Sequence, residues 1–196
     1  GKDAAVGLAK RPFLNNWIAG DDYEYGRALA DGVWSNLKKL KPKVERIGQS
    51  WWKVGEPDLT PYLTAISAAN PDAVIFATGA ASMVNAMKVA KATGFAEKIP
   101  MFIHTATELS TLAPLGLEAP ERVIGTSNYH FYYPDSPKNR AFAKSFRETY
   151  GREPKVGALY GYLAAQFMAN ALEKAGKMDR EKFIDALEKL KVDSPV

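Results

Sequence analysis

The sequence has no cysteine among its 196 residues, which excludes disulfide bridges, thiol nucleophiles and thiolate metal sites. This absence suits an oxidising compartment without requiring one. The sequence also lacks the G-x-G-x-x-G and P-loop lysine motifs of nucleotide-binding folds and the G-x-S-x-G turn of serine hydrolases. Histidine occurs only at His104 and His130, and neither has further ligands at the spacing that a metal site needs. We therefore predict no metal, no cofactor and no catalytic residue.

Long hydrophobic runs and dense blocks of one charge are also missing. The longest stretch without a charge, near residues 73–87, includes Thr78, Gly79 and Ser82 and is shorter than the ~20 apolar residues of a membrane span. The 26 lysines and arginines are interspersed with 22 aspartates and glutamates, for a net charge of +4. This pattern indicates a solvated surface and does not predict nucleic-acid binding. Hydrophobic residues make up 46% of the chain, so we expect one large domain, or one domain and part of another.

Short apolar runs alternate with amphipathic helical patterns through the first two thirds of the chain. The runs predict strands over residues 13–19, 43–51, 73–77, 100–103 and 122–127. The helical patterns between them predict helices over residues 24–40, 60–69, 80–93 and 108–115. One helix between successive strands is typical of right-handed βαβ units. The sequence therefore predicts an α/β fold, with a parallel sheet flanked by helices.

The alternation ends after residue 133. Three helical patterns follow without an intervening strand, over residues 137–150, 156–175 and 179–190. We therefore expect a C-terminal helical extension of the α/β fold. The chain would then divide into a ligand-binding lobe over residues 1–133 and a helical part over residues 134–196.

The turns after the predicted strands are the candidate ligand site, because open α/β sheets bind ligands at the carboxyl ends of their strands. The first turn, residues 21–26, reads DDYEYG and offers carboxylates and phenols rather than glycines. This composition favours a small-molecule site over a phosphate cradle. The turn at Thr78-Gly79-Ala80 is small enough for a ligand to approach the backbone, and a tight turn that needs small residues is the equal alternative. His104 follows a strand at the same edge, as a loop residue or as part of the site.

Four segments form a recognisable set. They are residues 17–26 (WIAGDDYEYG), 55–63 (GEPDLTPYL), 70–75 (NPDAVI) and 160–176, which ends in ALEKAG. In this order and spacing they resemble the C-terminal lobe of type I periplasmic binding proteins, of the branched-chain amino acid (Leu/Ile/Val) ABC transporter group. The resemblance covers nearly the whole chain. It implies a fragment of a two-lobed protein, in which residues 134–196 belong to the other, incomplete lobe.

The resemblance also implies a function and a site. The implied function is an extracytoplasmic solute-binding component of an ABC importer, periplasmic or lipid-anchored, which captures a small molecule and meets a permease of the inner membrane. In the family the tyrosine of the Y-G motif faces the cleft, which implies the same for Tyr25. The candidate ligand-binding residues are Asp22, Tyr25, Thr78, Gly79, Ala80, His104, Thr105 and Ala106. Amino-acid binders often hold the ligand ammonium with a carboxylate near the last of these positions, and the nearest acid here is Glu108.

Two other functions fit the same sequence pattern. An enzyme on a doubly wound fold would use Asp21 or Asp22 with His104 as acid–base partners and would turn over a substrate. A sensor or regulator domain on the same lobe would bind a ligand without a transporter partner. Genes for a permease and an ATPase beside this one would favour the importer over the sensor.

An apolar stripe on the long helix over residues 156–175 predicts self-association of the isolated chain. The stripe comprises Leu159, Leu163, Phe167, Ala171 and Leu172, which recur at helical spacing. In a two-lobed protein it would pack on the sheet of the other lobe. Left exposed, it would be an apolar patch of the kind that draws partners.

Overall fold

The chain forms two compact units, Gly1–Ser127 and Asn128–Val196, and each is described here by itself. The computed structural model describes residues 1–176, 179–188 and 190–196, without the side chain of Ala80. The sequence pattern predicts a division slightly later, after residue 133. The assignment of the later residues to another lobe stays a prediction.

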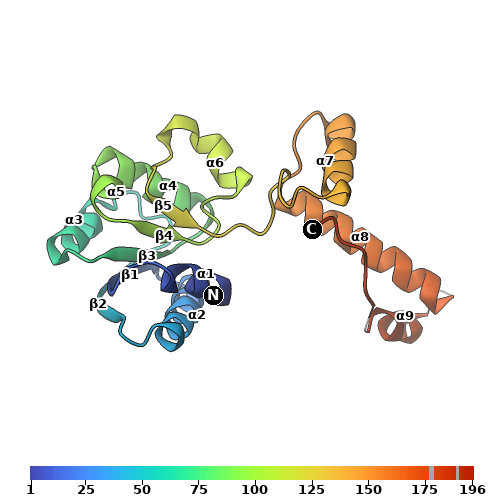
Figure 1. Ribbon diagram of the computed structural model, residues 1–196, viewed down its shortest axis with the longest axis horizontal. Helices are drawn as coiled ribbons and strands as arrows, with labels where there is room; N and C mark the ends of the chain where they lie inside the picture. The colour runs from blue at the N-terminus through green and yellow to red at the C-terminus, as the bar shows by residue number, and fades with distance from the viewer. Residues whose placement is uncertain (177–178, 189) are drawn as a thin grey trace. The chain divides into compact units, whose positions relative to one another are not determined.

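Strands and helices alternate along the first unit (Figure 1). Its strands are β1 (Asn15–Asp21), β2 (Glu45–Trp52), β3 (Ala73–Ala77), β4 (Met101–Ile103) and β5 (Val123–Gly125). Its helices are α1 (Lys2–Ala9), α2 (Glu24–Leu40), α3 (Thr60–Ala69), α4 (Ala80–Ala92), α5 (Phe95–Lys98) and α6 (Leu109–Leu115), followed by the 3-10 turn η1 (Gly116–Glu118). The predicted α/β fold is confirmed.

The five strands form one sheet in the order β2-β1-β3-β4-β5. All four neighbouring pairs are parallel, as predicted. β1 is an internal strand, because it pairs with β2 on one side and with β3 on the other. The chain therefore changes its direction of progress across the sheet between β1 and β3. In open α/β sheets this switch point is where the crevice for a ligand opens, at the carboxyl ends of the strands.

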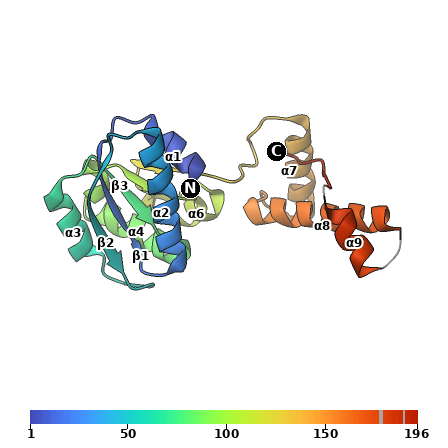
Figure 2. The same ribbon diagram turned by 90° about the horizontal axis from the view of Figure 1, so that it is seen from below.

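Helices cover both faces of the sheet, as Figures 1 and 2 show. On one face α1 and α2 pack against strand residues that include Ile18, Ile75 and Phe102. On the other face α3, α4 and α5 pack against residues that include Phe76 and Ile103. β3 is buried at all five positions, which explains its unbroken apolar sequence AVIFA.

α3 illustrates how local sequence sets an element. Pro61 lies in its first turn, where a missing N–H costs nothing. Leu59 occupies the N-cap position, and the preceding Asp58 accepts a hydrogen bond from the Thr60 backbone amide at 2.9 Å. Hydrogen bonding to Thr60 lowers the pKa of the Asp58 carboxyl. The helix ends at Asn70, which adopts the left-handed conformation (φ 50°) that asparagine tolerates.

The second unit contains α7 (Pro137–Tyr150), α8 (Val156–Ala175) and α9 (Arg180–Leu187). α7 and α8 end at Gly151 and Gly176, both in the left-handed conformation that glycine favours. Asp179 caps α9 by accepting a hydrogen bond from the Lys182 amide at 3.0 Å. The sequence pattern predicts this helix to residue 190. In the structure it ends at Leu187, and position 189 lies outside the described residues.

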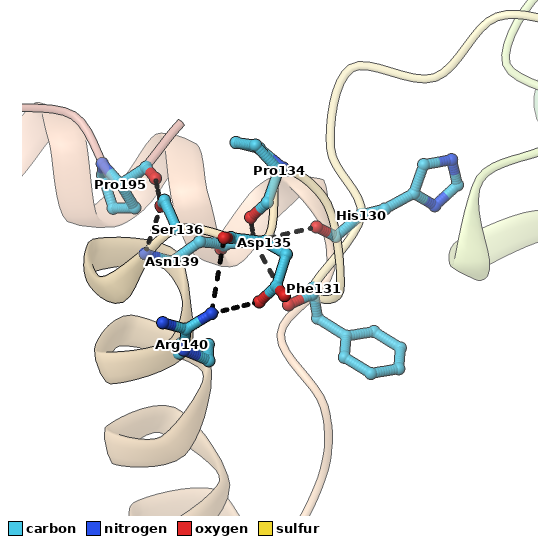
Figure 3. Close-up of polar contacts among 8 residues, drawn as sticks. All are labelled: His130, Phe131, Pro134, Asp135, Ser136, Asn139, Arg140 and Pro195. Carbon is cyan, nitrogen blue, oxygen red and sulfur yellow. Dashed lines mark hydrogen bonds and ion pairs between the residues drawn. The ribbon is translucent and has the colours of Figure 1, made fainter.

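Asn139, in the first turn of α7, organises the segment that leads into this helix (Figure 3). Its amide nitrogen lies 3.4, 3.2 and 3.0 Å from the carbonyl oxygens of His130, Phe131 and Pro134. Its amide oxygen accepts a hydrogen bond from the Tyr129 hydroxyl at 3.0 Å. Burial raises the pKa of Tyr129 to about 12, which keeps this phenol protonated and able to donate. Asn139 is 1% exposed, so these contacts replace water entirely.

Ser136 joins the same cluster to the end of the chain. The Ser136 hydroxyl accepts a hydrogen bond from the backbone N–H of Asn139 at 3.1 Å, and this bond caps α7. The same hydroxyl lies 3.3 Å from the Pro195 carbonyl oxygen, to which it donates. Beside it, Arg140 forms an ion pair with Asp135 (Figure 3). The start of α7 is therefore held by side chains from before the helix and by a backbone carbonyl from after it.

Replacing Asn139 with alanine should destabilise the second unit. Several buried polar groups would lose their partner together, at an expected cost of about 2–4 kcal/mol in the free energy of unfolding. Far-UV circular dichroism in urea should show an earlier helical transition. Tryptophan fluorescence reports the first unit, because all four tryptophans, Trp17, Trp34, Trp51 and Trp52, lie there, and its midpoint should not move. The exposed Asn170→Ala on α8 is the matched control, and equal losses in both variants would contradict the assigned role of Asn139.

Candidate binding site at the strand ends

Tyr25 and Gly79 meet at the switch point between β1 and β3. Tyr25 lies in the first turn of α2, which follows β1, and Gly79 is the N-cap of α4, which follows β3. A Cβ atom placed on Gly79 would lie 3.3 Å from Cε1 of the tyrosine ring. The absence of a side chain at Gly79 therefore leaves room for the ring, which remains 43% exposed. Two of the predicted ligand-binding residues are thus brought together at the expected edge.

Burial, followed by the neighbouring Tyr23 and then Glu108, raises the pKa of Tyr25 above its ordinary value of 10.0. The phenol therefore stays protonated at neutral pH and can donate a hydrogen bond. The rings of Tyr23 and Tyr25 are 5.9 Å apart and tilted, so the turn presents two aromatic side chains side by side. This arrangement supplies both an apolar wall and a polar hydroxyl, which suits a small organic ligand.

The two aspartates of the first turn have different surroundings. Asp21 is 1% exposed and accepts hydrogen bonds from the Trp52 indole at 3.0 Å and from the Thr78 hydroxyl at 2.7 Å. Asp22 lies at the surface and accepts two hydrogen bonds from Arg27, at 2.9 and 2.8 Å. Thr78, predicted to bind ligand, is fully buried and directs its hydroxyl to Asp21. Thr78 therefore supports Asp21 by a hydrogen bond and presents no exposed surface to a ligand.

The turn after β4 is compact and conformationally unusual. Thr105 has φ 61°, a left-handed backbone that is strained for a β-branched residue. Its carbonyl oxygen accepts hydrogen bonds from the Glu108 amide at 3.1 Å and from the Thr111 hydroxyl at 3.3 Å, which hold this geometry. Ala106 is fully buried in the same turn. The chain thus folds back and brings Glu108 towards the strand end.

His104 and Glu108 belong to this part of the sheet edge. His104 Nδ1 lies 2.6 Å from the Thr126 hydroxyl oxygen. Burial, and then the charge of the N-terminus, lower the pKa of His104, while Glu108 opposes this shift. Glu108 is 6% exposed, accepts a hydrogen bond from the Ser110 hydroxyl at 3.3 Å, and its charge reaches both His104 and Tyr25. Glu108 is not among the ligand-binding residues predicted from the sequence, because its position near the sheet edge depends on the left-handed turn at Thr105.

The strain at Thr105 predicts opposite effects for two exchanges between threonine and asparagine. Thr105→Asn should raise the free energy of unfolding by about 1 kcal/mol, because asparagine tolerates the left-handed region better. Asn70→Thr, at φ 50°, should lower it by a similar amount, about 1 kcal/mol. Urea denaturation followed by tryptophan fluorescence measures both. Shifts of the same sign would show that backbone conformation does not dominate at Thr105.

A cavity of about 390 Å³ opens at the ends of β1, β2 and β3. Its lining comprises Asp21, Tyr23, Val54, Gly55, Glu56, Gly79, Ala81, Ser82 and Asn85. Of the predicted ligand-binding residues whose side chains the structure describes, only Gly79 is among them. The loop after β2 therefore contributes to this edge, which the sequence pattern did not indicate.

Ala80 begins α4, and its side chain lies outside what the structure describes. The N-cap Gly79 makes no side-chain cap, and the first turn of α4 has no acidic residue.

The acid–base arrangement of the alternative enzyme is not assembled. In the described part of the chain, no hydrogen bond or ion pair joins His104 to Asp21 or Asp22. Among the described residues, no group of three or more histidine, aspartate or glutamate side chains could hold a metal ion. None of the helices in the described ranges has both the length and the apolar character of a membrane span.

The second unit has a hollow of its own, of about 750 Å³, between α7, α8 and the C-terminal segment. Aromatic side chains dominate it, with Phe142 at 5.0 Å from Tyr162 and Phe146 at 4.5 Å from Tyr150 between ring centroids. Gly157 and Gly161 leave the facing side of α8 flat. This hollow is larger than the cavity at the sheet edge. Polar side chains also line it, among them Lys138 and Asp193, which form an ion pair, and Gln166, whose amide donates to the Tyr162 hydroxyl at 2.8 Å.

The chain was compared with known protein families, curated proteins and solved structures. The sequence model of one family, described as periplasmic binding protein, matches residues 5–196. None of the curated proteins compared with the chain matches it.

Three solved structures illustrate the likeness in fold. A leucine-binding protein from Thermotoga maritima has 25% identity and a TM-score of 0.78, over 96% of this chain and 53% of that one. An ABC transporter solute-binding protein from R. palustris, in complex with benzoate, has 19% identity and a TM-score of 0.86, over 99% and 53%. An amino acid ABC transporter substrate-binding protein from Pseudomonas fluorescens Pf-5 has 21% identity and a TM-score of 0.83, over 98% and 52%. The chain therefore spans about half the length of these proteins.

Proposed function

The chain belongs to the periplasmic binding protein family, and from this membership we propose that it is part of the solute-binding component of an ABC importer. In this proposal the first unit is one ligand-binding lobe, and the second unit contributes helices to the other lobe. The component captures an amino acid or a related small organic solute between the lobes. It works outside the cytoplasm, in the periplasm or anchored by a lipid, and delivers the solute to a permease of the inner membrane.

The contact between Tyr25 and Gly79 at the switch point carries the proposal for the site. Tyr25 offers ring and hydroxyl at the place where a parallel sheet of this order opens a crevice. Because the ring is 43% exposed on this lobe, a second surface is needed to enclose a ligand against it. A two-lobed receptor supplies that surface by hinge closure.

A binding role without catalysis is supported by the separation of the groups that an acid–base mechanism would need. Asp21 accepts hydrogen bonds from Trp52 and Thr78, and Asp22 forms an ion pair with Arg27. His104 is neutral at pH 7, because burial lowers its pKa, and lies against Thr126. We therefore propose saturable binding with no product.

Two solute classes are compatible with this edge. An amino acid would place its ammonium group towards Glu108, the carboxylate whose charge reaches Tyr25. A carboxylic acid without an amine, such as the benzoate bound by the protein from R. palustris, would use the Tyr25 hydroxyl as a donor. The two classes differ in their response to Glu108→Gln, which should weaken an ammonium ligand and spare a simple acid.

Thermal-shift screening of the complete two-lobed protein against amino acids, their amides and aromatic acids tests the proposal. We expect one class to raise the melting temperature in a saturable way, because a ligand that binds only the folded state stabilises it. Chromatography of the mixtures should recover the solute unchanged. Turnover of any bound solute would favour the enzyme instead.

Self-association of the isolated 196-residue chain is a further part of the proposal. Of the expected stripe on α8, Leu159 and Ala171 are buried, Leu163 and Phe167 are half-buried, and Leu172 is 36% exposed. Outside the stripe, Tyr160 and Met168 of the same helix are 53% and 58% exposed. In the complete receptor an apolar surface of this kind would be covered by the other lobe. In the isolated chain it is exposed, so two copies of the chain should associate through it. Light scattering should show a molecular mass that rises with concentration. A monomer throughout the millimolar range would contradict the prediction.

A further inference from the structure

The carboxylate of Asp21 joins the ends of three neighbouring strands. Asp21 is the last residue of β1 and Trp52 the last residue of β2, and the two are paired in register. Thr78 follows the last residue of β3. One carboxylate oxygen accepts from the Trp52 indole at 3.0 Å, and the other accepts from the Thr78 hydroxyl at 2.7 Å. The three side chains are 1%, 2% and 0% exposed, so the connection is shielded from water.

A buried carboxylate is energetically unfavourable as a purely structural link. Its two side-chain donors are neutral, and removing a carboxylate from water costs more than two neutral hydrogen bonds return. An apolar residue of similar volume would fill the same space with less loss of hydration. What the carboxylate adds is geometry, because two acceptor oxygens on one rigid group join two donors through a single side chain.

Each of the three strand ends leads directly into a turn that forms the candidate site. Tyr23 and Tyr25 follow Asp21, residues 54–56 follow Trp52, and Gly79 follows Thr78. The same three turns line the cavity of about 390 Å³, and Asp21 is itself among the lining residues. The position of the Tyr25 ring against Gly79 therefore depends on how β1 and β3 are held at this level.

We infer that Asp21 is a positioning residue of the ligand site: its carboxylate fixes the three turns relative to one another and thereby sets the position of the Tyr25 ring beside Gly79 at the sheet edge. The inference rests on the proposed function, because that function is what makes these turns a ligand site. The contact network itself does not depend on any ligand.

The structure distinguishes three substitutions by what they leave in place. Asp21→Asn keeps an oxygen for the Trp52 indole and offers an N–H to the Thr78 oxygen, so both links survive with one reversed. Asp21→Ala removes both links. Thr78→Val keeps the shape of the side chain and removes only the link to β3. The control is Leu37→Ala, which empties a buried position (2% exposed) at the far end of α2, away from the turns.

Amide hydrogen exchange of the ligand-free chain, read by mass spectrometry, is the test. In Asp21→Ala, exchange over residues 22–26, 53–56 and 79–83 should rise about tenfold or more above that in Leu37→Ala at matched stability. Thr78→Val should show the same rise over residues 79–83 alone, and it serves if Asp21→Ala does not fold. Asp21→Asn should stay within about twofold of the unsubstituted chain.

Two results would overturn the inference. One is exchange that rises no more in these turns than in the Leu37→Ala control, which would make Asp21 an ordinary core residue. The other is Asp21→Asn behaving as Asp21→Ala, which would deny that the hydrogen bonds do the positioning. Failure of the proposed function would look different: the unsubstituted complete protein would bind neither L-leucine nor benzoate, and the exchange pattern would be unaffected.

Discussion

Replacing Gly26 with alanine is expected to unfold or severely destabilise the first unit. Gly26 lies in the first turn of α2, pressed against the ends of β1 and β3. A Cβ atom there would lie 2.2 Å from the Asp21 carbonyl oxygen and 3.0 Å from that of Ala77. Both obstacles are backbone atoms of the central sheet and cannot swing aside. We expect the free energy of unfolding to fall by about 3 kcal/mol or more, although alanine favours helix.

The same helix offers a matched control for this change. Gly32 is also in α2, and the nearest atom to a Cβ placed there is the Gly1 Cα at 3.9 Å, an ordinary contact distance. Gly32→Ala should therefore stabilise the unit by about 0.5–1 kcal/mol through helix propensity alone. Urea denaturation followed by tryptophan fluorescence measures both variants. Equal effects of the same sign would show that the close approach at Gly26 is not what the position requires.

Replacing Tyr25 with alanine in the complete receptor should cost at least about 30-fold in affinity for the solute found by the screen, or about 2 kcal/mol. The ring would be the largest contact that this lobe offers at the crevice. The melting temperature of the ligand-free protein should hardly change, because the side chain is 43% exposed. Titration calorimetry of the two proteins gives the affinities.

Two further variants separate the roles of the tyrosine. Tyr25→Phe keeps the ring, so it should lose only the contribution of a hydrogen bond, about 1 kcal/mol. Tyr160→Ala removes a tyrosine from α8, outside the candidate site, and should leave affinity unchanged. Unaltered affinity in Tyr25→Ala would remove this residue from the site and leave Gly79 beside a structural tyrosine.

Elements with a strong local signal could be predicted from the sequence with the bounds that the structure shows. β3 was predicted as residues 73–77 because an unbroken apolar run fits a strand buried on both faces. α2 and α8 were predicted as residues 24–40 and 156–175, where apolar residues repeat at helical spacing and Pro42 and Gly176 mark the stops. The parallel sheet followed from the alternation of strands and helices alone.

Features that depend on distant residues could not be predicted. α5, residues 95–98, is a single turn too short for a periodic signal. The left-handed Thr105 has no signature in a β-branched side chain, so the return of Glu108 to the sheet edge was missed. The links from Asp21 span 31 residues to Trp52 and 57 residues to Thr78, and only the strand order reveals them. The sequence therefore indicates where the site lies but not which side chains support it.

The strand order also has a consequence for biosynthesis. β1 pairs first with β2 on one side, and every later strand then joins the opposite edge in chain order, β3 on β1, β4 on β3 and β5 on β4. No strand has to insert between two that are already paired. A ribosome that has released the chain as far as Ala77 has therefore already provided three adjacent strands of the five. Until β4 emerges, the open side of β3 is an unpaired edge with five apolar residues, and this is the stage at which the nascent chain most needs protection from aggregation.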